Sequence, residues 1–125
     1  MRAIVVDDNA VVRELVRAIL RSRQHEVVGE ATGGSTVLKL CADLHPDIVL
    51  LDINLNGSSG LDILSELRTK HPSLPVVMIS GEATSSTVVR ARAMGAHGFV
   101  VKPFSAERML KAINRAMAGE SAAPF

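Results

Sequence analysis

Five short apolar runs alternate with longer amphipathic segments along the chain, and this alternation constrains the fold more than any other feature. The runs lie at residues 3–6, 26–31, 48–51, 76–80 and 98–101. Most of them are rich in valine and isoleucine and lack a polar–apolar alternation, so both of their faces must be covered. Runs of this kind predict strands of a parallel sheet that lies between two layers of helices.

The segments between the runs repeat apolar residues at three- and four-residue spacing, which is typical of amphipathic helices. We expect helices at residues 11–23, 35–44, 60–70, 85–94 and 105–117. Ser105 is a suitable N-cap for the last helix, and Gly95 stands where a helix C-terminus favours a left-handed residue. The repeated alternation predicts an α/β fold, a doubly wound five-stranded parallel sheet with flanking helices.

Length and composition limit the classes of function. The chain has 125 residues and a formal net charge of +1, with acidic and basic residues interspersed. We therefore expect one domain at residues 1–118, a tail or linker stub at 119–125, and no direct contact with nucleic acid or a membrane. The single cysteine cannot form an internal disulfide, and the first apolar run is too short for a signal peptide. A cytoplasmic location fits both observations.

Polar side chains collect where the predicted strands end. Asp7 and Asp8 follow the first strand, and Asp52 follows the third. Ser80 ends the fourth strand, and Lys102 follows the fifth. The carboxyl ends of parallel strands meet at one edge of the sheet, where open α/β proteins bind their ligands. We therefore expect three carboxylates, a hydroxyl and an amine to converge there.

This group of side chains suits phosphoryl chemistry. Three neighbouring carboxylates repel one another unless a cation intervenes, and hard oxygen ligands suit Mg²⁺ or Mn²⁺. A carboxylate such as Asp52 is then a competent nucleophile at phosphorus, while Lys102 and Ser80 can contact phosphoryl oxygens. Taken singly, each residue also suits an ordinary role as a helix cap, turn residue or surface charge. The coincidence at four strand ends favours the functional interpretation.

The same residues carry a family resemblance. The segments VVDDN at 5–9, IVLLDINL at 48–55, MISG at 78–81 and GAHGFVVKPF at 95–104 resemble, in order and spacing, the CheY-like receiver domains of two-component response regulators. The resemblance runs from about Arg2 to about Met117 and so covers nearly the whole chain. It implies a flavodoxin-like sheet with the strand order 2-1-3-4-5.

The resemblance assigns roles around a metal. Asp52 matches the phosphoacceptor, and Asp7 and Asp8 match the acidic pair that binds Mg²⁺ beside it. The backbone carbonyl of Asn54 matches the group that completes the metal shell. Many receivers have proline four residues after the acceptor, whereas this chain has Asn56 in a glycine-rich stretch. We therefore expect this loop to be more flexible.

The resemblance also assigns the residues that respond to phosphorylation. Ser80 and Lys102 match the residues that contact the phosphoryl group, and Lys102 with Pro103 matches the family's cis peptide bond. Phe99 matches the switch aromatic, which turns inward when Ser80 moves. Phenylalanine lacks the phenolic oxygen that draws tyrosine outward. We therefore expect the burial of Phe99 to depend less on the movement of Ser80 than the burial of a tyrosine would. An ordinary core aromatic is the alternative for Phe99.

The leading hypothesis is a receiver domain that accepts a phosphoryl group on Asp52, with Mg²⁺, from a histidine kinase or phosphotransfer protein. It would catalyse only its own phosphorylation and dephosphorylation. It would act on an output protein, through a fused output domain, or as a phosphorylation-dependent homodimer. Two alternatives are a phosphohydrolase-like enzyme on the same fold and a phosphorylation-independent binding module. Asn54 disfavours the enzyme, since it cannot act as a general acid, and no nucleotide-binding motif is present.

Overall fold

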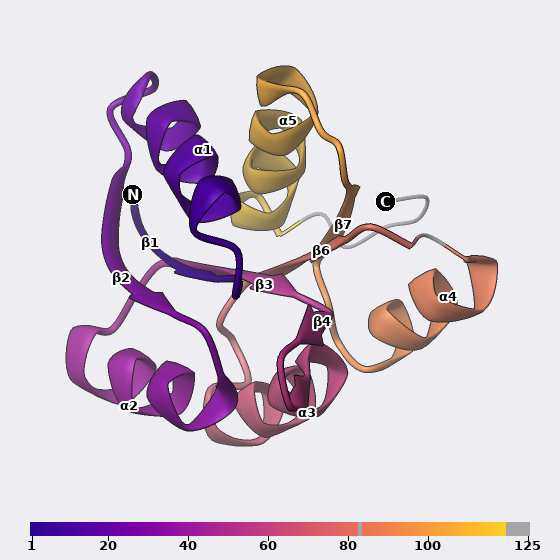
Figure 1. Cartoon of the computed structure of the whole chain (residues 1–125). Coiled ribbons are helices and arrows are strands. Elements are labelled where there is room, and N and C mark those ends of the chain that lie inside the picture. Colours follow the sequence, from indigo (N-terminus) through magenta and orange to yellow (C-terminus); the bar gives the residue numbers. More distant parts are fainter. Residues whose placement is uncertain (83, 120–125) are drawn as a thin grey trace.

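The computed structural model describes residues 1–82 and 84–119 and shows a parallel sheet with helices on both faces (Figure 1). The sheet contains β1 (Arg2–Val6), β2 (Glu26–Ala31), β3 (Ile48–Asp52), β6 (Val76–Ser80) and β7 (Gly98–Val101). The order is β2-β1-β3-β6-β7, and each neighbouring pair is parallel. For the five long strands this is the predicted order 2-1-3-4-5, so the flavodoxin-like α/β fold is confirmed.

Four helices of the described residues connect the strands and a fifth follows β7: α1 (Ala10–Arg21), α2 (Gly34–Leu44), α3 (Gly60–Lys70), α4 (Ser85–Ala93) and, last, α5 (Ala106–Met117). In Figure 1, α1 and α5 lie above the sheet, and α2, α3 and α4 lie below it. All five helices are confirmed, with ends that differ from the prediction by at most two residues. Within residues 1–82 and 84–119, no helix has the length and apolar content that a membrane crossing requires.

Two hydrophobic cores form, one beneath each helix layer. Alternate strand residues such as Val5 and Leu50 pack with α1 and α5, whereas Leu51 and Met78 pack with the helices on the other face. The central strands β3 and β6 are buried at every position. Continuous burial is the reason that these two strands are apolar almost throughout and carry polar residues only at their carboxyl ends.

Local side-chain chemistry determines where α1 and α5 begin. The Asn9 side chain accepts hydrogen bonds from the amides of Val11 and Val12, and Ser105 accepts one from the amide of Arg108. The predicted Ser105 cap is therefore confirmed. Because Asn9 supplies the cap of α1, the Asp7 and Asp8 carboxylates are not used for it. Helix capping, the alternative role for this segment, is therefore carried out by Asn9 and not by the acidic pair.

One small element was not predicted from the sequence. β4 (Asn54–Leu55) and β5 (Ser58–Ser59) pair in antiparallel register as a hairpin, with Leu55 opposite Ser58. Gly57 has a φ of +74°, as the second central residue of a type II turn requires. The Leu55 side chain is buried in the core. The loop that we expected to be more flexible thus contains a hairpin with one residue in the core. Strands of two residues are too short to show a hydrophobic pattern, so the sequence did not reveal them.

Helix α3 starts in contact with the end of β3. A Cβ atom on Gly60 would lie 2.0 Å from the Asp52 carbonyl oxygen and 2.7 Å from the Cα of Ile53. The Gly60 amide donates a hydrogen bond to the carbonyl of Ile53 at 2.6 Å. Glycine is required here because a side chain has no space, and this close approach sets the backbone around Asp52.

Candidate metal and phosphoacceptor site

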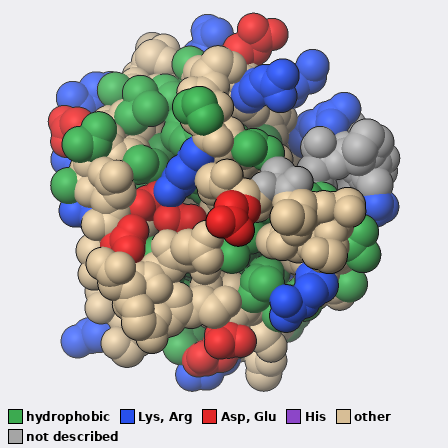
Figure 2. Space-filling model, turned by 45° about the vertical axis from the view of Figure 1, so that its right-hand side comes forward, with side chains coloured by type: hydrophobic (Ala, Val, Ile, Leu, Met, Phe, Trp, Pro, Cys, Tyr) green, Lys and Arg blue, Asp and Glu red, His purple; other side chains and the backbone are tan. Residues whose placement is uncertain are grey.

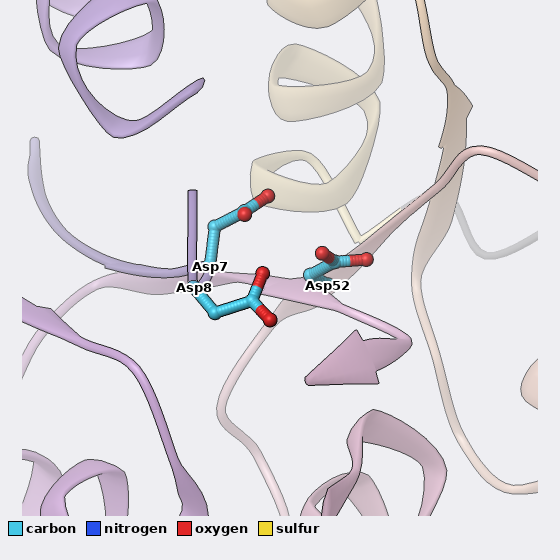
Figure 3. A group of neighbouring side chains, drawn as sticks. All are labelled: Asp7, Asp8 and Asp52. Carbon is cyan, nitrogen blue, oxygen red and sulfur yellow. The ribbon is translucent and has the colours of Figure 1, made fainter. Parts of the chain in front are cut away.

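Three carboxylates converge at the carboxyl edge of the sheet (Figure 3). Asp7 and Asp8 follow β1, and Asp52 is the last residue of β3. One oxygen from each lies within 4.8 Å of the others. Asp7 and Asp52 are 0% and 3% exposed, and Asp8 is half-buried. Negative charge is therefore concentrated where water screens it poorly.

Lys102 follows β7 and approaches the acidic group, which is the cluster of the Asp7, Asp8 and Asp52 carboxylates. Its Nζ lies 2.8 Å from Asp7 Oδ2 and 3.0 Å from Asp52 Oδ2. Asp7, Asp52 and Lys102 continue the strand positions that face α1 and α5, which is why they meet on one side of the sheet. Figure 2 shows acidic side chains near the middle of the visible face, with a basic side chain directly above them.

The electrostatics of the pair formed by Lys102 and Asp52 follow from burial and charge. Burial alone would lower the pKa of Lys102, but its contacts with the Asp7 and Asp52 carboxylates outweigh this effect and raise it. Burial raises the pKa of Asp52, and the charge of Asp7 adds to the rise, although Lys102 and the Asn54 amide oppose it. For Asp52, the Lys102 ammonium therefore does not offset the effect of burial on the pKa.

The oxygen atoms of the site fit a divalent cation. Asp7 Oδ1 accepts a hydrogen bond from the amide of Asn9 at 2.8 Å. Asp7 Oδ2 is buried and accepts no well-oriented hydrogen bond from the described residues, although it lies close to the Lys102 ammonium. Three neighbouring carboxylates, one of them with an oxygen that accepts no well-oriented hydrogen bond from the described residues, are suitable ligands for a hard divalent cation such as Mg²⁺ or Mn²⁺.

Ser80 is the buried last residue of β6, and its hydroxyl is engaged by the loop after that strand. It donates a hydrogen bond to the Glu82 carbonyl at 2.8 Å and accepts one from the Glu82 amide at 3.0 Å. The Lys102 amide donates to the Ser80 carbonyl at 2.7 Å, and the Lys102–Pro103 peptide bond is cis. The Ser80 side chain is thus held by its own loop, at the end of the strand that neighbours β3.

Phe99 lies on the other face of the sheet from Asp52. It is opposite Met78 on the neighbouring strand, and both side chains belong to the core beneath α2, α3 and α4. Because side chains alternate along β6, Ser80 and Met78 share this face. Phe99 is 8% exposed, so it is buried in this structure.

Sequence reasoning missed Arg13, which supports the backbone of the acidic pair. Its Nη1 donates to the Asp7 carbonyl at 2.7 Å, and its Nε donates to Glu30 on β2 at 3.1 Å. Glu30 also forms an ion pair with Arg17. Nothing in the helical pattern separates Arg13 from an ordinary surface charge, because the contact depends on how α1 lies against β2.

Replacing Lys102 with methionine should destabilise the metal-free domain by about 3 kcal/mol, because Asp7 and Asp52 would then be buried without a counter-charge. Millimolar Mg²⁺ should restore part of this loss by supplying positive charge to the same oxygens. Urea unfolding in EDTA and in Mg²⁺ measures both effects. Lys111→Met, at an exposed position of α5, is the control. Equal losses in the two variants, unchanged by Mg²⁺, would contradict the prediction.

Comparison with known proteins agrees with the fold. The family model of the response regulator receiver domain matches residues 3–114. The chain is 37% identical over 116 residues to the chemotaxis protein CheY of Listeria monocytogenes, covering 93% of this chain and 98% of that protein. It is 36% identical over 118 residues to the nitrate/nitrite response regulator protein NarL of Escherichia coli, covering 94% of this chain but 55% of NarL.

A solved structure shows the same architecture. The receiver domain of NtrX from Brucella abortus is 42% identical, with a TM-score of 0.87, and the match covers 93% of this chain and 98% of that one. The match covers the same share of this chain as the match to CheY of Listeria monocytogenes. The chain therefore belongs to the receiver domain family of two-component response regulators.

Proposed function

We propose that Asp52 accepts a phosphoryl group in a reaction that depends on Mg²⁺ or Mn²⁺. The observation that supports this most is the buried Asp52 carboxylate, which lies 3.0 Å from the Lys102 ammonium and beside the carboxylates of Asp7 and Asp8. Asp7, Asp8, Asp52 and the backbone carbonyl of Asn54 would hold the metal. When bound, the metal would screen the negative charge of the incoming phosphoryl group.

Asp52, Lys102 and Ser80 would act directly on the phosphoryl group. A carboxylate oxygen of Asp52 forms the new bond to phosphorus as the bond from phosphorus to the donor breaks. Lys102, which contacts Asp52 Oδ2 at 3.0 Å, would neutralise a phosphoryl oxygen. Ser80 would donate a hydrogen bond to another phosphoryl oxygen, for which its hydroxyl must leave the Glu82 backbone.

This movement of Ser80 would link phosphorylation to the rest of the domain. Ser80 shares a sheet face with Phe99, and the loop that holds its hydroxyl leads into α4. A change at Ser80 would shift the equilibrium between two arrangements of this loop and of Phe99. Exposed apolar side chains on the α4, β7 and α5 elements, namely Val89, Val101 and Met117, suit an output surface there.

We propose a histidine kinase or a phosphotransfer protein as the phosphoryl donor. The responding partner would be an output protein, a fused output domain or a second phosphorylated copy in a homodimer. Residues 1–118 would form the receiver domain, with residues 119–125 as a tail or linker stub, of which 120–125 lie outside the described residues. The domain would act in the cytoplasm and catalyse only its own phosphorylation and dephosphorylation.

Incubation with acetyl phosphate tests this function directly. We expect a single phosphoryl adduct in the intact mass spectrum when Mg²⁺ is present and none when EDTA replaces it. The adduct should be lost at alkaline pH, as an acyl phosphate is. An adduct that forms equally well in EDTA would contradict the metal dependence. No adduct from acetyl phosphate or from a phosphorylated kinase, together with no Mg²⁺ binding by calorimetry, would favour a phosphorylation-independent binding module.

A further inference from the structure

Strand β4 and the turn that follows it present two backbone amides to two different carboxylates. The Asn54 amide donates to Asp52 Oδ1 at 3.2 Å, and the Asn56 amide donates to Asp8 Oδ2 at 3.0 Å. Backbone amides two residues apart along an extended chain point in the same direction, whereas the amide between them points the opposite way. The Leu55 amide accordingly faces β5, and the free edge of β4 faces the acidic group.

We propose that the backbone amide of Asn56 is a positioning group for the metal ligand Asp8. Among the described residues it makes the one hydrogen bond to the Asp8 carboxylate. Figure 3 shows one oxygen of Asp8 directed toward Asp52 and the other toward β4. The hydrogen bond to Asn56 thus holds one oxygen and leaves the other for the cation. This role rests on the proposed metal-dependent function.

The position of this amide is determined by the hairpin. Leu55, which precedes Asn56, is buried in the core, and Gly57, which follows it, allows the turn with its φ of +74°. The Gly60 amide closes the base of the hairpin on the carbonyl of Ile53. A carboxylate held by such a fixed donor loses less freedom when it binds a cation, so its affinity for the cation is higher.

Asn56 takes part through its backbone, and this makes a clean substitution possible. Proline is favoured at the first central position of a type II turn, and its preceding residue is favoured in the extended conformation that Leu55 already has. Asn56→Pro therefore removes the amide proton while keeping the turn. Asn56→Ala keeps the amide and removes the side chain, so it is the matched control.

Calorimetric titration of the metal-free full chain with Mg²⁺ measures the effect. We expect the Kd for Mg²⁺ to rise about 3- to 10-fold in Asn56→Pro, which corresponds to the loss of one hydrogen bond. It should stay within about twofold of the wild-type value in Asn56→Ala, in which this hydrogen bond remains. Urea unfolding of both variants establishes that each is folded. Equal Kd values in the two variants would overturn the positioning role and leave the proposed function intact.

A second measurement needs no metal. In EDTA, hydrogen exchange of the Asn56 amide should be slowed in the wild-type chain and should accelerate in Asp8→Ala, because its acceptor is then absent. Exchange that is unaffected by Asp8→Ala would overturn the proposal. If the wild-type chain binds no Mg²⁺ at all, the proposed function fails and the positioning role fails with it.

Discussion

An Asp52→Asn variant should form no phosphoryl adduct under conditions in which the wild-type chain is modified by acetyl phosphate and Mg²⁺. The side-chain amide has nearly the shape of the carboxylate, so the buried position can accept it, but it lacks the negative oxygen that attacks phosphorus. Intact mass spectrometry over a time course measures the loss. Asp43→Asn, at an exposed position of α2, should be modified like the wild type.

The stability of the same variant provides an independent check that it is folded. Burial, followed by the charge of Asp7, raises the pKa of Asp52 above its ordinary value. A carboxyl group with a raised pKa favours folding while it is protonated, and this contribution is lost as the pH rises through that pKa. Above that pH and in EDTA, Asp52→Asn should therefore be at least as stable to urea as the wild type. An adduct on a well-folded Asp52→Asn chain would show that another residue is the acceptor.

Gly60→Ala should destabilise the domain by about 3 kcal/mol or more, because the added methyl group would overlap the backbone. Its Cβ would lie 2.0 Å from the carbonyl oxygen of Asp52, which is part of a buried central strand and cannot move away freely. Alanine favours a helix over glycine by about 1 kcal/mol, so propensity alone predicts the opposite sign. The steric cost is the larger of the two, and urea unfolding measures the net effect.

The control for Gly60→Ala is Gly33→Ala, which also lies at the N-terminus of a helix. A Cβ on Gly33 would meet no atom within 4 Å. The change in stability there should stay below about 1 kcal/mol, as at a helix N-cap without a side-chain hydrogen bond. Similar losses of stability at Gly33 and Gly60 would mean that the close approach of Gly60 to Asp52 is not what makes alanine unfavourable at position 60.

The residue patterns of the sequence were sufficient to predict the α/β fold class and the edge of the sheet at which the carboxylates meet. Uninterrupted apolar runs such as residues 48–51 identify strands that are covered on both faces, and this signal is local in the chain. Parallel strands share one carboxyl edge, so Asp7, Asp8 and Asp52 could be placed together before any distance was known. Family resemblance then predicted a separate role for each of them, which the residue types by themselves left open.

Only the tertiary structure decided how these carboxylates are held. The contact of Lys102 with Asp52 joins residues 50 positions apart, and that of Asn56 with Asp8 joins residues 48 apart. Neither these contacts nor the space at Gly60 leaves a local pattern in the chain, because they depend on how packed strands and helices set distances between remote segments. Hydrophobic periodicity determines which elements form and which faces they bury, while packing determines which polar atoms meet.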